Sequence, residues 1–301
     1  MEKRTKAYIE LSMGTALAGS SIVAGKLMTE SMPVFLSQGL SLIFALAVLL
    51  PLLKRKEGYI FRIPKKDLPI LVLQALLSMF LFRIFLLYGL KYTTAVESSI
   101  ITGSTPAVTA VISFLFLKEK ASWHKIAGIA SAIFGILLIN LVGSKAGSGA
   151  AASSIIGNLF IFLAVIGEAL LTILRKVTSN KVSNLAAATY ITLFAFLMFL
   201  PVSIIDALSF DFRGMGKNQW IYIIYYGIAV TAVAYILWFK GVSKVPASTA
   251  AVYTGVMPVT ALILSLIVLK EGVSIPQLAG AAMILFGIMF VSSKREESCK
   301  A

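Results

Sequence analysis

The chain has 301 residues, of which 58% are hydrophobic and 13% are charged, and its mean hydropathy is +0.92. No soluble domain of this length needs so much apolar surface, so the composition excludes a soluble protein and indicates an integral membrane protein. The net charge of +14 does not indicate nucleic-acid binding, because the basic residues gather between apolar stretches. One Cys and one His exclude a disulfide framework and a Cys/His metal cluster, and no cofactor is expected.

About 20 apolar residues are enough for a helix to cross the hydrocarbon core of a bilayer. Windows of that length predict ten transmembrane helices, at 7–27, 33–53, 68–90, 95–117, 123–142, 154–176, 185–207, 218–239, 246–269 and 274–293. The connecting loops are short and leave no room for a soluble domain. The predicted fold class is therefore an all-α integral membrane protein. The basic N-terminus imitates a signal peptide, but Glu10 interrupts its apolar run, so we expect the first span to be retained.

The basic residues predict the orientation of these spans. If the N-terminus is inside, the cytoplasmic segments hold 20 Lys and Arg residues and the opposite side holds six, while Arg83 lies within a span. By the positive-inside rule, both termini are predicted to be cytoplasmic. We therefore expect a multi-pass protein of the cell (cytoplasmic) membrane, with the lipid bilayer and its anionic headgroups as partners.

The second half of the chain repeats the first. Residues 89–139 and 241–291, compared at a constant offset of 152, are identical at 16 of 51 positions. We predict two five-helix domains, at 1–145 and 150–301, joined by a small-residue linker at 144–154 that has no helical pattern. Because five is odd, the second copy must enter the bilayer inverted, which is a transporter architecture with the substrate site near the midplane between the repeats.

Short motifs recur at matching places in the two halves. The first half contains Tyr88-Gly-Leu-Lys-Tyr-Thr-Thr-Ala, Thr105-Pro106, Leu117-Lys-Glu119, Gly128 and Gly135. The second half contains Lys240-Gly-Val-Ser-Lys-Val-Pro-Ala, Met257-Pro258, Leu269-Lys-Glu271, Gly280 and Gly287. The chain thus resembles two EamA domains, the arrangement of ten-helix transporters in the drug/metabolite transporter superfamily.

This resemblance implies a secondary transporter that moves small metabolites by alternating access. It points to amino acids or related compounds, more often exported than imported. The implied substrate site lies between the halves, lined by the first, third, fourth, sixth, eighth and ninth spans.

Two prolines lie inside predicted spans at matching positions. Pro106 and Pro258 each remove a backbone hydrogen bond and are expected to bend their helices, either beside the substrate path or as fixed packing kinks. Polar or small residues precede both, which predicts a cavity lining that includes Thr102, Ser104, Tyr253 and Thr254.

Two charged residues within spans are the sharpest candidates for the site. Arg83 could hold a substrate carboxylate; the alternatives are snorkelling to the outer surface and a structural pair with Glu97. Its counterpart in the second half is Tyr235, so the role of Arg83 is not duplicated. Glu168, in the sixth span, could exchange protons during transport or form a permanent ion pair or hydrogen bond.

Aromatic residues complete the candidate site. Tyr190, Tyr235, Trp238 and Tyr253 could form a substrate surface, although Trp and Tyr also populate the membrane interface. The glycines of the first and repeated spans, such as Gly14 and Gly19, are expected to permit close helix packing.

Several functional classes stay open at this stage. Within the transporter class, the alternatives are a carrier of drug-like amphipaths or of sugar- or nucleotide-type metabolites. No Walker A motif is present, and a membrane-embedded enzyme lacks a convergent catalytic set such as H-E-x-x-H, so neither an ATPase nor an enzyme is expected. A channel or interaction subunit is not excluded, and both a monomer and a homodimer fit the sequence.

Overall fold

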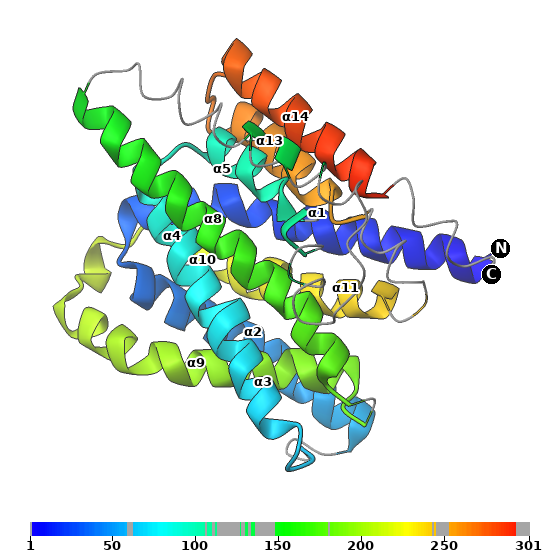
Figure 1. Ribbon diagram of the computed structural model, residues 1–301. Helices are drawn as coiled ribbons and strands as arrows, with labels where there is room; N and C mark the ends of the chain where they lie inside the picture. Colours follow the sequence, from blue (N-terminus) through cyan, green and yellow to red (C-terminus); the bar gives the residue numbers. More distant parts are fainter. Residues whose placement is uncertain are drawn as a thin grey trace, which may run out of the picture.

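The computed structural model describes residues 2–58, 63–105, 107–109, 112, 127, 130–131, 134–135, 148–179, 181–242, 244 and 253–292. Within these residues every regular element is a helix, which confirms the all-α prediction (Figure 1). The helices of the first half are α1 (Glu2–Ser31), α2 (Val34–Glu57), α3 (Leu68–Ala75), η1 (Leu76–Leu81), α4 (Phe82–Tyr92) and α5 (Ala95–Thr102). Those of the second half are α8 (Ser148–Val177), α9 (Asn184–Ser209), η2 (Phe212–Gly214), α10 (Lys217–Tyr225), η3 (Tyr226–Val233), α11 (Ala234–Val242), α13 (Val256–Val268) and α14 (Ile275–Ser292).

Five helical stretches are long and apolar enough to cross a membrane. They are Val34–Glu57, Leu68–Tyr92, Ser154–Arg175, Asn184–Ser209 and Lys217–Gly241, and α13 is a shorter apolar helix. Each overlaps a span predicted from the sequence, so the chain is a multi-pass membrane protein. The count of ten spans and the cytoplasmic position of both termini remain predictions.

Short-range signals in the sequence explain several helix ends. Gly58 ends α2 in the left-handed conformation, with a φ of 74° that a glycine adopts without strain, and its N–H donates to the carbonyl of Lys54. Thr94 and Ser183 precede α5 and α9, and their side-chain oxygens accept hydrogen bonds from the N–H groups of Glu97 and Ala186. These two helices therefore begin at conventional N-caps.

The linker expected at 144–154 is shorter than predicted. Helix α8 already begins at Ser148, so the second part of this segment is helical. Three consecutive alanines, at 150–152, follow Gly149, and alanine has the highest intrinsic helix propensity. The alanine run therefore extends the sixth span toward the N-terminus of the chain, to Ser148. The small residues of this segment had instead indicated a linker.

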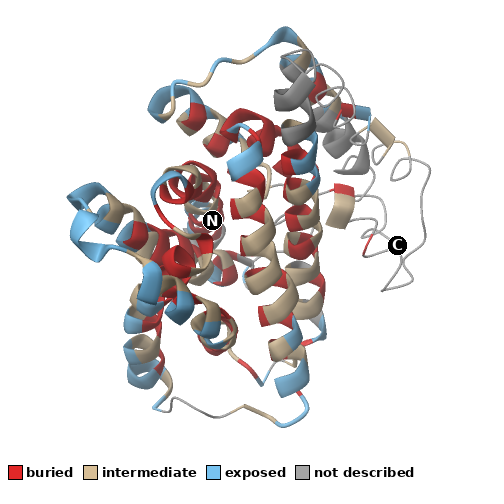
Figure 2. Ribbon diagram, turned by 90° about the vertical axis from the view of Figure 1, so that its left-hand side faces the viewer, coloured by how far each residue is buried: buried red, intermediate tan, exposed pale blue. Residues whose placement is uncertain are grey.

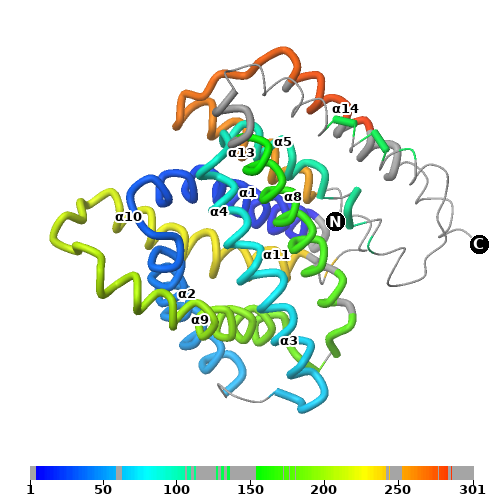
Figure 3. Tube along the Cα trace, turned by 60° about the vertical axis from the view of Figure 1, so that its left-hand side comes forward, coloured from blue at the N-terminus to red at the C-terminus, as the bar shows by residue number. Residues whose placement is uncertain are grey.

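The most extensive helix contacts join the first half of the chain to the second. Helix α2 packs along α9, α4 along α8, and α1 along α11 and α13 (Figures 1 and 3). Two of these contacts are related by the repeat. Helix α4 of the third span packs on α8 of the sixth span, and α11 of the eighth span packs on α1 of the first span. Helices α5 and α13, which belong to the fourth and the ninth predicted span, also contact each other. This arrangement has the symmetry that an internal duplication predicts.

A π-helical segment interrupts the third span of each half. Segment η1 covers 76–81, and moving these residues by the repeat offset of 152 places them at 228–233, inside η3. In η3 the hydroxyl of Thr231 donates a 2.9 Å hydrogen bond to the carbonyl of Tyr226, five residues earlier. Such wide turns in transmembrane helices leave carbonyl groups open to other partners and are frequent at functional sites.

The predicted spans that hold the two prolines in the sequence each contain a turn in their described part. Turns at 103–104 and 254–255 fall within one residue of equivalent positions, and α13 starts at Val256, directly after the second turn. Pro258 therefore lies in the first turn of α13, where a missing N–H costs no helical hydrogen bond, and not at a mid-helix kink. Pro106 lies outside the described residues.

Buried residues lie mainly where the helices meet, and many exposed residues lie at helix ends and connecting segments (Figure 2). The largest apolar cluster combines Leu42 and Met79 of the first half with Tyr190 and Phe199 of the second. A second cluster joins Leu86 and Ile101 to Ile161 and Val165. The two halves therefore share their hydrophobic core.

Candidate functional site

Arg83 lies at the centre of a polar cluster between the halves. Its side chain is 3% exposed, on α4. Nη1 donates a 2.5 Å hydrogen bond to Oε1 of Gln38, and Nη2 donates a 2.6 Å hydrogen bond to Oγ1 of Thr231. The guanidinium carbon also lies 5.1 Å from the centre of the Tyr226 ring, a cation–π contact. Arg83 is thus held by residues of both halves and does not snorkel to the surface.

All of these partners are neutral. Within the described part of the chain, no Asp or Glu forms an ion pair with Arg83. Glu97, the alternative partner expected from the sequence, instead accepts hydrogen bonds from Thr93, Ser154 and Asn158, at 2.6, 2.8 and 3.1 Å. An arginine near the centre of a membrane helix costs about 2.5–3.5 kcal/mol on insertion scales. The protein therefore keeps a costly positive charge between its halves.

Gln38, which orients Arg83, is itself incompletely satisfied. Its side chain is fully buried on α2, and its amide nitrogen Nε2 has no hydrogen-bond partner. A buried donor without an acceptor costs about 1–3 kcal/mol. The amide cannot reverse to relieve this, because its N–H groups would then face the guanidinium of Arg83.

Glu168 lies on α8 and is only partly buried. Its Oε2 accepts a 3.1 Å hydrogen bond from Oγ1 of Thr105, which also lies 2.7 Å from the carbonyl oxygen of Thr102. A threonine hydroxyl has a single proton and cannot fully satisfy two acceptors. Among the residues that the structure describes, Glu168 forms no ion pair, so the permanent pair considered from the sequence is not present there.

Tyr235 lies near Tyr190, another of the predicted aromatic residues. It is partly buried on α11, and its ring meets the Phe239 ring edge-on, with ring centres 5.9 Å apart. Tyr190, 1% exposed, belongs to the apolar cluster against which Tyr235 packs. Two residues predicted separately from the sequence, Tyr190 and Tyr235, thus meet at one apolar cluster.

The remaining predicted residues lie around this region or have partners of their own. Thr102 and Ser104 are buried and donate to the carbonyls of Ser99 and Ile101 in the preceding turn. Tyr253 stacks on Tyr8 of α1, with ring centres 5.4 Å apart. Three others, Trp238, Thr254 and Pro258, are partly buried. Nothing in these contacts assigns them to a ligand.

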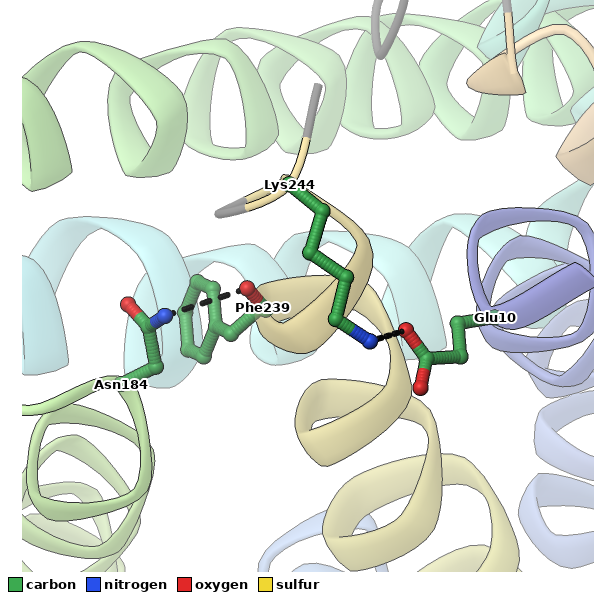
Figure 4. Close-up of polar contacts among 4 residues, drawn as sticks. All are labelled: Glu10, Asn184, Phe239 and Lys244. Carbon is green, nitrogen blue, oxygen red and sulfur yellow. Dashed lines mark hydrogen bonds and ion pairs between the residues drawn. The ribbon is translucent and has the colours of Figure 1, made fainter. Parts of the chain in front are cut away.

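An ion pair lies beside the site, where the end of α11 meets α1. Glu10 pairs with Lys244, and Nδ2 of Asn184 donates a 3.1 Å hydrogen bond to the carbonyl of Phe239 (Figure 4). The figure shows these contacts tying the segment at the end of α11 to α1 and α9. Glu10, which interrupts the first apolar run of the sequence, is therefore part of a contact between the halves.

Glu271, from the repeated Leu-Lys-Glu motif, caps a helix of the other half. Its two carboxylate oxygens accept hydrogen bonds from the N–H groups of Ala95 and Val96, at 3.0 and 2.8 Å. These are the first residues of α5, and a carboxylate there also interacts favourably with the helix dipole. This repeated motif thus joins the end of the ninth span to the start of the fourth. Lys118 and Glu119 lie outside the described residues.

Gln38 and Thr231 are absent from the residues predicted from the sequence. The signal for Gln38 was a lone amide in an otherwise apolar span, and Thr231 lies four residues before Tyr235 on the third span of its half. Neither residue carries charge, and their importance follows only from the packing of α2 and η3 against α4.

Comparison with known proteins places the chain in a family. The profile of the EamA-like transporter family matches twice, at residues 5–141 and 155–293. The uncharacterized transporter YetK of Bacillus subtilis is 41% identical over 297 residues, which covers 99% of this chain and 90% of YetK. A probable terminal-alkyne amino-acid exporter of Streptantibioticus cattleyicolor is 23% identical and covers 76% of this chain and 74% of that protein.

A solved crystal structure shows the same fold. It covers 99% of both chains with a TM-score of 0.66, at 18% sequence identity. The double family match and the similarity to YetK over nearly the whole length agree with this likeness. The chain is a multi-pass membrane protein that belongs to the EamA-like transporter family.

Proposed function

We propose that this protein is a secondary transporter that exports a small metabolite of the amino-acid class across the cytoplasmic membrane by alternating access. The observation that carries the proposal is Arg83, a buried cation between the halves whose partners among the described residues are neutral groups. A guanidinium of this kind can bind the carboxylate of a substrate. The name of the Streptantibioticus relative, an amino-acid exporter, supports the same class.

The symmetric packing of the halves supports alternating access. Two five-helix repeats of opposite orientation, with both termini in the cytoplasm, would give inward-facing and outward-facing states of similar energy. Arg83 and Glu168 lie on α4 and α8, which pack against each other across the halves. A zwitterionic substrate has a carboxylate that could interact with Arg83 and an ammonium group that could interact with Glu168.

Glu168 is the proposed site of proton coupling. If its carboxyl group is protonated, it can donate to Thr105, whose hydroxyl is then free to donate to the carbonyl of Thr102. Both protonation states thus have a hydrogen-bonded arrangement, which is a requirement for a group that binds and releases protons in each cycle. The Glu168→Gln variant keeps the shape of the side chain and removes its ability to bind and release a proton.

Counterflow in proteoliposomes tests this function, with a labelled panel of amino acids, sugars and nucleosides and with and without a pH gradient. We expect uptake of an amino-acid class that Arg83→Ala abolishes and whose response to the pH gradient Glu168→Gln removes. Exposed Glu30, changed to Gln, is the control. A pH response that survives in Glu168→Gln would refute the coupling role, and uptake confined to sugars or nucleosides would refute the substrate class.

A drug-like amphipath is the second candidate substrate. The apolar cluster around Tyr190, Met79 and Phe199, with Tyr235 packed against it, offers an aromatic surface next to the polar cluster. An amphipathic cation would interact with Glu168 and would not need Arg83. Retention of transport in Arg83→Ala would therefore favour this alternative.

A further inference from the structure

The amide of Gln38 is the least satisfied polar group next to Arg83. Its oxygen is used by the guanidinium at 2.5 Å, and this contact fixes which end of the amide faces Arg83. The other end, Nε2, has two N–H donors and finds no acceptor in the part of the chain that the structure describes, although the residue is fully buried. The missing partner is therefore a hydrogen-bond acceptor.

Arg83 has a complementary deficit at the same place. Thr231 uses its only proton on the carbonyl of Tyr226, so it serves Arg83 as a neutral acceptor. Gln38 Oε1 and the Tyr226 ring are neutral as well. The cluster thus has unused N–H donors and an uncompensated positive charge, and a single anionic acceptor would correct both.

We infer that Gln38 is a specificity-determining residue that binds the carboxylate of the transported substrate together with Arg83. One carboxylate oxygen accepts from Nε2 of Gln38 while the other accepts from the guanidinium. This assignment rests on the transport function proposed above. An amide or an alcohol in place of the carboxylate brings no charge and leaves one of these donors unpaired, so the pair selects the acid.

The other half of the duplication indicates how many anionic groups the substrate has. At the repeat offsets, Arg83 corresponds to Tyr235, Thr231 to Met79 and Gln38 to Ala188. Met79 belongs to the apolar cluster of the core, and Tyr235 packs against it. The symmetry-related position is therefore apolar, and the site takes one carboxylate attached to an apolar remainder. Dicarboxylates and phosphate dianions do not fit this arrangement.

The full chain in proteoliposomes tests the role of Gln38, with L-leucine, L-methionine and L-phenylalanine compared with their amides. In the wild type we expect each transported acid to be preferred over its amide at least tenfold. In Gln38→Met this ratio should fall to near one, mainly through a higher KM for the acid. Gln74→Met, which changes another fully buried glutamine on the third span, should keep the wild-type ratio.

Thermal stability gives a second, substrate-free measurement. Gln38→Glu places a carboxylate permanently beside Arg83, so it should melt above Gln74→Glu and should no longer be stabilised by L-leucine. Melting of Gln38→Glu at or below Gln74→Glu would overturn the inference, as would an unchanged acid-to-amide ratio in Gln38→Met. That second result leaves the transport function standing, whereas absence of transport for all acids and amides refutes the proposed function and this inference with it.

Discussion

Ser131 donates a 2.7 Å hydrogen bond to the carbonyl of Met283, and the two residues occupy the same position in the two repeats. Equivalent positions can touch each other only where they lie close to a common symmetry axis. Helices α2 and α9, which are equivalent at the offset of 150, also pack against each other. The duplication is thus expressed in the packing, and the charged site lies where this symmetry brings the halves together.

Glu271 is expected to stabilise the start of α5. Its carboxylate accepts from the N–H groups of Ala95 and Val96, which otherwise lack helical partners. Glu271→Ala should lower the free energy of unfolding by about 1–2 kcal/mol, the usual cost of a lost helix cap. Thermal melting in detergent measures this loss, with exposed Glu30→Ala as control. Equal melting temperatures for the two variants would contradict a capping role.

Gly227 is expected to tolerate no side chain. A Cβ atom there would lie 2.2 Å from the carbonyl oxygen of Ser41 and 3.0 Å from Cβ of Phe44. Gly227→Ala must push η3 away from α2, so it should cost about 1–3 kcal/mol of stability and reduce transport, because η3 also holds Thr231. A Cβ at Gly272 meets nothing within 4 Å, and Gly272→Ala should have little effect. Similar melting of both variants would refute this account of the packing.

Asp67, just before the third span, provides a prediction for acid stability. The Ser179 hydroxyl donates a 2.5 Å hydrogen bond to the Asp67 carboxylate, and the Ser179 N–H donates a second one at 3.0 Å. The hydroxyl bond is the largest of the effects that hold the pKa of Asp67 below its ordinary value of 3.8. The N–H bond and the positive charges of Lys66 and Lys181 act in the same direction, and burial acts in the opposite direction. A lowered folded-state pKa stabilises the protein above the unfolded pKa, and this contribution disappears as the pH falls through the folded value.

The consequence of this shift is measurable as a pH-dependent difference between two proteins. The wild type should melt above Asp67→Asn at pH 7, and the difference should shrink as the pH falls below about 4, the range set by the ordinary carboxyl pKa. Ser179→Ala should make the acid dependence shallower. A difference that is constant between pH 7 and pH 3 would show that the carboxylate charge is not involved.

The sequence predicted those features that depend on local composition or on repetition. Apolar runs predicted helices that the structure contains, and Gly14 and Gly19 allow the close helix contacts expected of them, since a Cβ at Gly19 would lie 2.3 Å from the Met257 carbonyl. The sequence also singled out Arg83 and Glu168 because charges are rare in spans. It could not predict Gln38 or the cap at Glu271, since both depend on contacts between residues far apart in the chain.

The matched π-helical segments show the same limit. Leu76–Leu81 and Tyr226–Val233 carry no proline, and apolar residues dominate in both, so their composition does not differ from that of an ordinary span. The wider turn depends on packing against the other half, such as the approach of Gly167 to the carbonyl of Leu77, where a Cβ would lie at 2.8 Å. Local sequence preferences do not contain that information.

Thr231 is expected to be more important than its chemistry suggests, because its oxygen accepts from Arg83 while its proton serves the Tyr226 carbonyl. Thr231→Val keeps the volume but leaves a buried charge short of one partner, so it should cost about 1.5–3 kcal/mol of stability, the usual range for hydrogen bonds to charged groups. Buried Thr192, whose hydroxyl donates only to the Ala188 carbonyl, is the matched control. We expect Thr192→Val to unfold within about 1 kcal/mol of the wild type in equilibrium unfolding experiments. If Thr231→Val unfolds alongside it and transports normally, Arg83 does not need this contact.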